Sequence, residues 1–381
     1  MKYVKIKEVA EVVSGSTPKT NIDEYWNGEY NWITPKEITE DSKYIYNTER
    51  TLSIDGIKSC ALKELKVNTV LLTSRAPIGK VALVGKTMYC NQGFKNLVCN
   101  EQVINPEYMY YWLKSHNNYL NSLGRGATFK EISKKIVEEI EIPLQDLDTQ
   151  HKIVEILDKA QELIDKRKEQ MELLDELIQS KFLEMFGNPV TNPKGWEVEK
   201  INTIAPIEQY KGEINDGKVW LLNLDMVESN SGRIINYNYV DKEEVGNSTC
   251  TFSTDNVLYS KLRPYLNKVA IPDREGYATS EMIPLKPNRE ILNREYFAYS
   301  LRSKAFVDYI SEKVSGAKMP RVVMSDFKNF KLTIPPLALQ EEFADFVGKV
   351  NDIKIVLNKS LEQLNNNFDS LINKAFKGEL F

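Results

Sequence analysis

The sequence has little cysteine and histidine. Among its 381 residues there are four cysteines and two histidines. No two cysteines form a CxxC pair, and only His116 and His151 could supply imidazole ligands. A structural zinc site needs four such ligands at short, regular spacings, so this pattern argues against a metal site. Free thiols in a reducing compartment are expected at Cys60, Cys90, Cys99 and Cys250.

Long apolar runs are also absent. No stretch of eighteen or more apolar residues occurs, whereas a transmembrane helix needs about twenty. The segment Met1–Ala10 alternates apolar and charged side chains and lacks the apolar core of a signal peptide. We therefore expect a cytoplasmic protein.

The net charge gives little support to a nucleic-acid partner, because the chain carries a formal charge of -4. The distribution of the charges is more informative than their sum. Acidic residues are concentrated in 148–184, whereas 125–135 and 263–268 are basic. A chain of this kind can hold an acidic segment away from DNA while its basic loops contact the phosphates.

Catalytic signatures are missing as well. The sequence contains no HExxH or GxSxG motif and no Asn/Asp-Pro-Pro-aromatic run of an amino-methyltransferase. The nearest approach to a nucleotide site is GKVALVGKT at Gly79–Thr87, where five residues separate the two glycines and a phosphate-binding loop requires four. We expect no catalytic residue in this chain, and an enzyme that uses this loop is one alternative.

An internal repeat of about 190 residues is the strongest feature of the sequence. Five blocks return in the same order: KIKEVA as KINTIA, NWITPKEI as VWLLNLDM, LLTSRAP as LYSKLRP, Gly-Ala as Gly-Ala, and IEIP as LTIP. Chance similarity would not preserve this order, so we infer a duplication. In this interpretation the third block aligns Arg75 with Arg263.

Each repeat predicts a mixed domain followed by a long helix. Short β-like runs such as Val67–Leu72 and Lys80–Val84 alternate with turns that contain proline and glycine. Pro106–Ser122 is predicted as a helix that carries proline in its first turn, and Asn293–Ser311 is its counterpart. This arrangement suits two domains of moderate size.

Apolar residues recur along both long helices at alternating spacings of four and three. The first of these helices is predicted to begin at a cap on Asp148 or Thr149 and to stop at Gly187–Pro189. A heptad pattern requires a partner helix, and the other copy is the nearest one. The predicted interface comprises Ile153, Leu157, Ile164, Met171, Leu174, Ile178, Val350, Leu357, Leu361, Leu364, Phe368 and Leu371. The alternative is that each helix only covers its own domain.

These patterns predict an α+β protein with two similar α/β domains, joined by two long antiparallel coiled-coil helices and related by an internal pseudo-two-fold axis. The expected limits are 1–147 for the first domain, 148–187 for the first helix, 188–337 for the second domain and 338–381 for the second helix. DNA is itself close to two-fold symmetric, so two such domains at a fixed separation predict a split target site.

Several motifs resemble one family over the whole chain. Ser14–Ile38, with the sequence SGSTPKTNIDEYWNGEYNWITPKEI, is similar to the opening of target recognition domains in Type I restriction–modification specificity subunits. LLTSRAPIGKVAL followed by NQGFKNL, and GATFKEIS leading into a long helix that starts with glutamine, also resemble that family. The second repeat departs from the pattern, because Ala205–Asp216 lacks the Thr-Pro and Tyr-Trp-Gly signatures.

The resemblance implies a non-catalytic subunit for sequence-specific DNA recognition. Each domain would read one half of a bipartite site, and the divergence of the repeats implies that the site is asymmetric. The helices would set the spacing between half-sites and dock two modification subunits, which bind S-adenosylmethionine and methylate adenine. Restriction subunits would join the complex, and this chain would hold no cofactor itself. The alternative is a coiled-coil scaffold protein that reads no DNA.

Candidate DNA contacts lie in turns and basic loops. A guanidinium at Arg75 or Arg263 can bind guanine or phosphate, and the alternative is an arginine paired with a carboxylate of its own domain. For single lysines the alternative is a solvated side chain. The predicted contacts of the first domain are Thr17, Lys19, Ser74, Arg75, Lys80, Gln92, Lys95, Arg125, Thr128 and Lys130. Those of the second domain are Lys261, Arg263, Tyr265, Lys268, Lys318 and Arg321. Trp26 and Trp32 are expected in the core.

Overall fold

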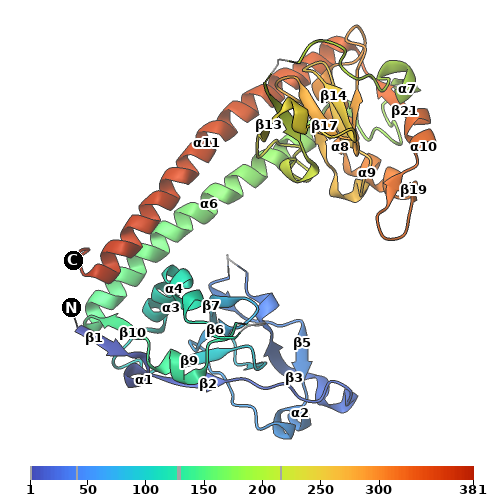
Figure 1. Cartoon of the computed structure of the whole chain (residues 1–381). Coiled ribbons are helices and arrows are strands. Elements are labelled where there is room, and N and C mark those ends of the chain that lie inside the picture. The colour runs from blue at the N-terminus through green and yellow to red at the C-terminus, as the bar shows by residue number, and fades with distance from the viewer. Residues whose placement is uncertain (1, 40–41, 127–129, 215–216) are drawn as a thin grey trace. The chain divides into compact units, whose positions relative to one another are not determined.

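The computed structural model describes residues 2–39, 42–126, 130–214 and 217–381. Its contacts divide the chain into two units, one formed by Met1–Lys166 with Leu361–Phe381 and the other by Arg167–Ser360. Each unit contains one mixed domain and parts of both long helices (Figure 1). The four segment limits expected from the sequence stay a prediction, because these contacts group each domain with its helices.

The first unit is built from short strands and short helices. Its strands are β1 (Lys2–Lys5), β2 (Ala10–Ser14), β3 (Trp26–Ile33), β4 (Tyr44–Ile45), β5 (Arg50–Leu52), β6 (Val70–Ser74), β7 (Ile78–Val84), β8 (Tyr89–Cys90), β9 (Lys95–Cys99) and β10 (Glu141–Leu144). Its short helices are α1 (Ile6–Val9), α2 (Ile54–Ser59), α3 (Pro106–Ser115), α4 (Asn117–Ser122) and α5 (Lys134–Glu138).

The main sheet of this unit has five strands in the order β2-β9-β6-β7-β4, and a second sheet has the order β5-β3-β8. All five residues of β6 are buried, as expected for a central strand that is covered on both faces. β1 pairs antiparallel with β10, which brings the two ends of the domain together. α3 packs on β6 and β7, and its side chains Tyr108 and Leu113 are fully buried.

The helix predicted at Pro106–Ser122 consists of two helices, α3 and α4, that are separated at His116. Asn105 caps α3, because its side-chain oxygen accepts hydrogen bonds from the amides of Glu107 and Tyr108 at 2.7 and 3.2 Å. The backbone of His116 leaves the helical region there, with φ −104° and ψ 26°. Apolar periodicity alone did not indicate this break.

The second unit is built in the same way. Its strands are β11 (Glu197–Lys200), β12 (Lys218–Leu222), β13 (Tyr239–Asp241), β14 (Thr249–Phe252), β15 (Val257–Ser260), β16 (Val269–Ala270), β17 (Gly276–Thr279), β18 (Met282–Leu285), β19 (Val314–Ser315), β20 (Arg321–Val322) and β21 (Lys331–Ile334). Its short helices are α7 (Ile201–Ile204), α8 (Arg294–Arg302), α9 (Lys304–Ser311) and α10 (Met324–Asn329).

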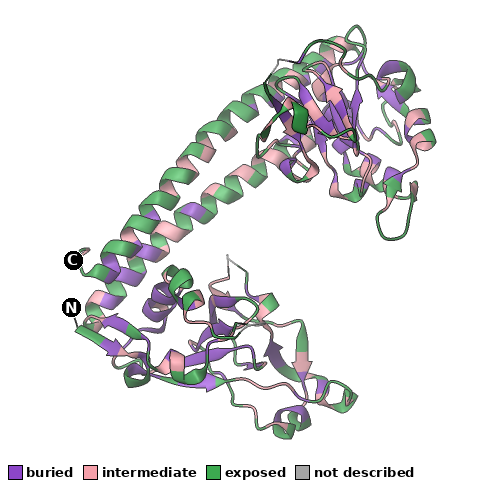
Figure 2. Ribbon diagram, in the orientation of Figure 1, coloured by how far each residue is buried: buried purple, intermediate pink, exposed green. Residues whose placement is uncertain are grey.

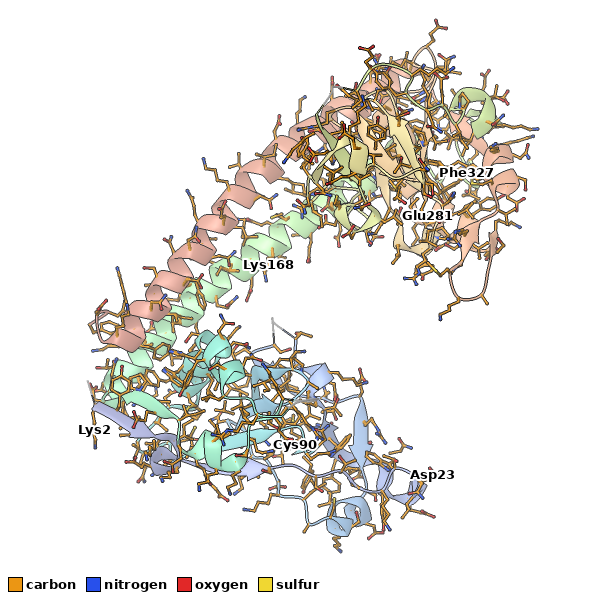
Figure 3. The ribbon with its side chains drawn as sticks, viewed as in Figure 1. Lys2, Asp23, Cys90, Lys168, Glu281 and Phe327 are labelled. Carbon is orange, nitrogen blue, oxygen red and sulfur yellow. The ribbon has the colours of Figure 1, made fainter. Side chains whose placement is uncertain are left out.

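Strand pairing confirms the duplication. β11 pairs with β21 as β1 pairs with β10, and both pairs are antiparallel. β12 has an antiparallel neighbour, β13, and a parallel one, β17, as β3 has β5 and β8. β15 lies between β16 and β18 as β6 lies between β7 and β9. Phe327 of α10 is fully buried in the core of the second unit (Figure 3).

Two long helices follow the domains, α6 (Leu147–Phe186) and α11 (Leu337–Lys377). The cap of α6 is Asp146, whose carboxylate accepts hydrogen bonds from the amide and hydroxyl of Thr149 at 2.9 and 2.7 Å. The prediction of a cap at Asp148 or Thr149 was therefore wrong, because both residues already lie within the first turn. α6 ends as predicted before Gly187, which has a φ of 76°.

The two long helices pack against each other in antiparallel fashion within each unit. In the first unit, Leu157 and Ile164 of α6 share a core with Phe368 of α11. In the second unit, Ile178 shares a core with Val350. All twelve residues of the predicted interface are buried or half-buried. Most of the remaining helix surface is exposed (Figure 2).

A helix-to-helix ion pair reinforces this packing in the second unit, where Lys354 Nζ lies 2.6 Å from Asp175 Oδ1. The helices also cover the domains. The rings of Tyr108 and Phe376 lie 5.1 Å apart in the first unit. The helices therefore pair as predicted, and the alternative that each helix only covers its own domain is wrong, because α11 also contacts the first domain.

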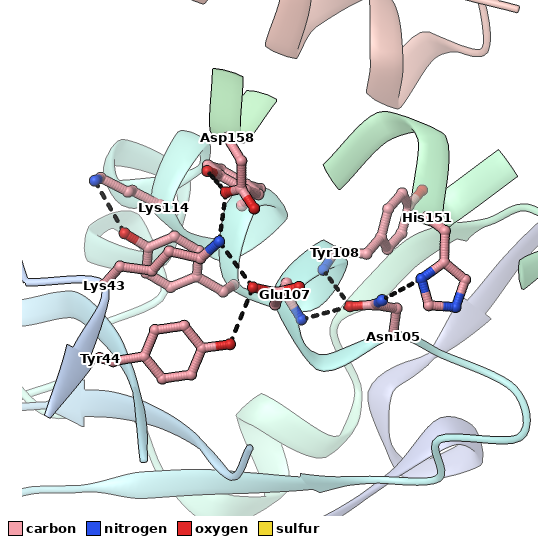
Figure 4. A network of polar contacts seen from close by, with 10 residues as sticks. Lys43, Tyr44, Asn105, Glu107, Tyr108, Lys114, His151 and Asp158 are labelled. Atoms are coloured by element: carbon pink, nitrogen blue, oxygen red, sulfur yellow. Dashed lines mark hydrogen bonds and ion pairs between the residues drawn. The ribbon is translucent and has the colours of Figure 1, made fainter. Parts of the chain in front are cut away.

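A polar network attaches the first domain to α6 (Figure 4). Lys43 Nζ lies 2.8 Å from Glu107 Oε1 of α3 and also forms an ion pair with Asp158 of α6. The Tyr44 hydroxyl donates to the same carboxylate of Glu107 at 2.9 Å. Three elements that are distant in the sequence are thereby joined around one half-buried lysine.

Candidate nucleic-acid interface

Two backbone segments form the candidate interface of the first unit: the turn that follows β6 and the loop that begins at Arg125. Arg75 in the turn and Arg125 in the loop each form a β-bridge with Glu131. The amide of Ile132 donates to the carbonyl of Ser74 at 3.0 Å. These bonds hold the turn and the loop side by side at the end of a buried strand.

A carboxylate lies among the cations of this interface. Glu131 Oε1 is 3.3 Å from Lys95 Nζ, and Glu131 Oε2 is 4.0 Å from Arg75 Nη1. The side chains of Arg75 and Glu131 remain 36% and 40% exposed. An open cleft of about 480 Å³ adjoins them, and its lining includes Lys130. Thr128 of the same loop, a predicted contact, lies outside the described residues.

Two predicted contacts of the first unit are buried. Ser74 is fully buried and Lys95 is 8% exposed. Lys95 Nζ lies 3.4 Å from Ser74 Oγ. Because β6 is covered on both faces, its alternation offers no outward position at Ser74. Lys95 therefore links the buried Ser74 hydroxyl to the Glu131 carboxylate. The structure does not place these two side chains on the exposed surface that was expected for DNA contacts.

Lys80 and Lys268 occupy equivalent positions and also point inward. Lys80 Nζ donates to the carbonyl of Ile38 at 2.6 Å, and Lys268 Nζ donates to the carbonyl of Leu224 at 2.6 Å. Ile38 is the C-terminal cap of one single-turn helix, and Leu224 is the first residue of another. The two lysines, predicted as DNA contacts, hold these turns against the sheet.

A second group of predicted contacts covers the tryptophan pair of the first unit. The Thr17 hydroxyl donates to the side-chain carbonyl of Gln92. Lys19 is exposed, and its backbone carbonyl accepts from Trp26 Nε1 at 3.1 Å. Trp26 and Trp32 are buried, as predicted, with their rings perpendicular and 5.0 Å apart.

The second unit ties an equivalent turn to the hairpin β19–β20. Leu262 forms a β-bridge with Arg321. The amide of Val322 donates to the carbonyl of Lys261 at 2.9 Å, and the amide of Arg263 donates to the carbonyl of Pro320 at 2.8 Å. The structure therefore brings the predicted contacts of this domain, apart from Lys268, into one region. The exposed members are Arg263, Tyr265, Lys318 and Arg321, with Lys261 half-buried beside them.

The predicted alignment of Arg75 with Arg263 was wrong by one position. The equivalent backbone bridges place Leu262 at the position of Arg75. Arg263 corresponds to Ala76, since both residues precede a proline and both have positive φ values, 49° and 45°. Equivalent positions in the two turns are defined by backbone conformation. The sequence alignment matched the two arginines by residue type and therefore placed the second turn one residue out of register.

The exposed guanidinium of Arg321 is paired with a carboxylate. Its Nε lies 3.1 Å from Glu281 Oε1 and 3.2 Å from Oε2, and its Nη2 lies 2.8 Å from Oε1. Glu281 lies in the turn between β17 and β18, and its side chain is 20% exposed (Figure 3). Hydrogen bonding to Arg321 holds the pKa of the Glu281 carboxyl below its usual value, so the pair stays ionic at neutral pH.

Two residues near these surfaces were missed by the sequence analysis. Glu281 occupies the position that Gly93 has in the first unit. The amide of Lys261 donates to the carbonyl of Glu281, as the amide of the equivalent Ser74 donates to the carbonyl of Gly93. A glycine in one copy gave no signal for a carboxylate in the other. Arg50 is the second such residue, and its guanidinium lies 3.5 Å from the ring centre of Trp26.

The described residues show no arrangement of metal ligands. Among them, no three His, Cys, Asp or Glu side chains gather as a metal site. All four cysteines are free, and burial raises the pKa of the Cys90 thiol to about 12. The near-match to a phosphate-binding loop is mostly strand β7, and no helix begins after Lys86 as such a loop requires. None of the described helices is long and apolar enough to cross a membrane.

Comparison with known proteins identifies the family. The model of the Type I restriction modification DNA specificity domain matches residues 1–173 and again residues 193–366. The chain belongs to this family. It is 30% identical to the Type I restriction enzyme MjaIX specificity subunit of Methanocaldococcus jannaschii, over 99% of this chain and 92% of that protein. It is 24% identical to the EcoDI specificity subunit of Escherichia coli, over 99% and 88%.

Two solved structures share the fold. A chain from work on complex assembly and conformational transition of the type I R-M system superposes with a TM-score of 0.62 at 17% identity, covering all of this chain and 98% of that one. The S subunit of a Type I restriction-modification system from M. genitalium gives a TM-score of 0.51 at 17% identity, covering 98% and 96%.

The family assigns DNA recognition rather than catalysis to this specificity subunit. Its two matched copies coincide with the two repeated domains. The scaffold alternative is not favoured, because the match covers the recognition domains themselves as well as parts of both helices. The predicted DNA contacts remain predictions at the level of single residues.

Proposed function

We propose that each unit reads one half of a split, asymmetric DNA site as part of a Type I restriction–modification complex. The observation that carries the proposal is a duplicated platform. Each unit presents one proline-containing turn bonded to one basic loop at the end of a buried strand. Equivalent backbone bridges hold the turn in both units and the exposed side chains differ, as expected for two readers with different target bases.

The exposed and half-buried cations of these platforms have the chemistry that DNA binding requires. Lys and Arg at loop tips neutralise phosphates, and bidentate side chains at the groove read base edges. The cations proposed for these roles in the first unit are Arg75, Arg125 and Lys130 of the platform, together with Lys19 beside the tryptophan pair. Those in the second unit are Lys261, Arg263, Lys318 and Arg321.

The long helices are proposed to set the spacing of the half-sites and to dock two modification subunits. Both helices expose large apolar side chains. Ile355 and Val356 of α11 are each 67% exposed, and Leu163 and Leu173 of α6 are 55% and 53% exposed. A partner that covers these residues would remove apolar surface from water. The modification subunits would supply S-adenosylmethionine and methylate adenine, and restriction subunits would join them.

An exchange of domains tests the assignment of one half-site to each unit. Residues 196–332 are replaced by the corresponding segment of another specificity subunit, and the methylated sequence of the assembled complex is determined. We expect one half-site to change and the other to remain. The matched control replaces residues 5–142 and should change only the other half. If either exchange alters both half-sites, the two units do not read independently.

A further inference from the structure

The two platforms carry ion pairs of opposite polarity at one structural position. Glu131 and Arg321 occupy equivalent positions, because each forms the β-bridge to the turn of its unit. The residue after each also donates its amide to the carbonyl at the end of the buried strand, Ile132 to Ser74 and Val322 to Lys261. In the first unit the loop supplies the anion at this position, and Lys95 and Arg75 face it. In the second unit the hairpin supplies the cation, and Glu281 faces it.

The pairing in the second unit leaves a specific part of the guanidinium free. Arginine has five N–H donors in a planar fork. Glu281 accepts from Nε and Nη2, which form one edge of the Arg321 fork. The end edge, formed by Nη1 and Nη2, points away from this carboxylate. Two parallel donors on one edge match the O6 and N7 acceptors of guanine in the major groove.

The surroundings of Arg321 favour a base contact rather than a general electrostatic one. Lys318 and Arg263 are exposed nearby and carry no ion pair to a carboxylate among the described residues, so they suit the phosphates. A carboxylate beside DNA is repelled by the backbone, and its presence weakens non-specific binding. Glu281 offsets this loss of affinity by restricting the orientation of Arg321. A side chain that is already fixed loses less conformational entropy when it binds a base.

We infer that Arg321, held in place by Glu281, reads a guanine through its Nη1–Nη2 edge in the half-site of the second unit. Glu281 is a positioning residue that does not itself touch the base. The first unit has a carboxylate where this guanidinium stands, so the two half-sites differ at the corresponding base. This inference rests on the proposed function, since it assumes that the platform faces DNA.

The test uses the complete complex of this chain with its modification subunit. Duplex oligonucleotides carry each of the four bases at each position of the second half-site, and their affinities are measured in competition. Arg321→Lys keeps the charge but loses the planar fork, and Glu281→Gln keeps the shape but loses the anion. Arg274→Lys is the matched control, because Arg274 is an equally exposed arginine whose Nε and Nη2 bond Asp273.

We expect Arg321→Lys to reduce discrimination for guanine at one base pair by roughly 5- to 150-fold, the worth of one bidentate contact. Glu281→Gln should relax the same base pair less strongly while it raises affinity for unrelated DNA, because a negative charge is removed. Arg274→Lys should leave the preference unchanged. A purely structural role for Glu281 would not produce this selective change at one base pair.

Three results would overturn the inference. The first is a folded Arg321→Lys complex, shown by an unchanged melting temperature, that keeps the full guanine preference. The second is a uniform loss of affinity for all oligonucleotides, which would make Arg321 a phosphate contact. Both leave the proposed function intact. The third is a wild-type complex that binds no DNA, and this outcome would overturn the proposed function as well.

Discussion

The side-chain oxygen of Gln150 accepts a hydrogen bond from the backbone amide of Asn105 at 2.8 Å. Gln150 lies in the first turn of α6, and Asn105 is the cap of α3. Gln340 of α11 makes the same 2.8 Å contact with the amide of Asn293, which caps α8. Each domain is therefore attached to the long helix that follows it by a buried glutamine.

Replacing this glutamine should destabilise the protein strongly. Gln150 is fully buried, and its amide nitrogen also donates to the carbonyls of Val103 and Gln145 at 3.1 and 2.8 Å. Gln150→Leu removes the side-chain partner of the Asn105 amide and of the Val103 carbonyl, at about 1–3 kcal/mol for each. Chemical denaturation should show a loss of at least about 2 kcal/mol in the free energy of unfolding.

The matched control for this variant is Gln363→Leu on the exposed face of α11. A substitution there should change the free energy of unfolding by less than about 0.5 kcal/mol. Equal effects of the two variants would show that the buried hydrogen bonds do not secure the domain to its helix.

Lys80 and Lys268 should act on stability rather than on sequence preference. Each ammonium group bonds the carbonyl of a single-turn helix at 2.6 Å, and hydrogen bonds from charged donors contribute about 1.5–3 kcal/mol. Lys80→Met should lower the free energy of unfolding by that order and leave the methylated sequence unchanged. A variant of normal stability that methylates a different sequence would restore the original prediction that Lys80 contacts DNA.

The sequence predicted much of this fold because its signals were long or repeated. Heptad spacing over both helices identified an interface whose residues are all buried or half-buried, from Ile153 to Leu371. The repeat predicted two equivalent domains, and strand pairing confirms them. Trp26 and Trp32 were correctly placed in the core. Each of these inferences used many residues at once, so local errors had little effect.

The details that failed depend on one or two residues. The cap of α6 moved to Asp146, since several polar residues near a helix start can all serve as caps. Ser74 proved buried because a strand covered on both faces has no outward position. The partner of Arg321 was invisible because Glu281 is adjacent to it only in space, 40 residues away along the chain. Contacts of this kind require the fold.

The spacing of the half-sites should follow the length of the helix pair. Inserting seven residues at corresponding points of α6 and α11 preserves the heptad register and lengthens each helix by about 10.5 Å. At about 3.4 Å per base pair, the unspecified spacer should grow by about three base pairs. The measurement is the methylated sequence of the extended complex. An unchanged spacer in an active complex would mean that the helices do not determine the distance.

The central claim is that this chain gives a methyltransferase complex its DNA sequence preference. The most direct measurement is a map of N6-methyladenine in cells that produce the modification subunit with and without this chain, obtained by single-molecule sequencing. The account predicts a bipartite, asymmetric motif that is methylated only when the chain is present. A stable complex between the two proteins that adds no methylation, or a motif that persists without this chain, would contradict it.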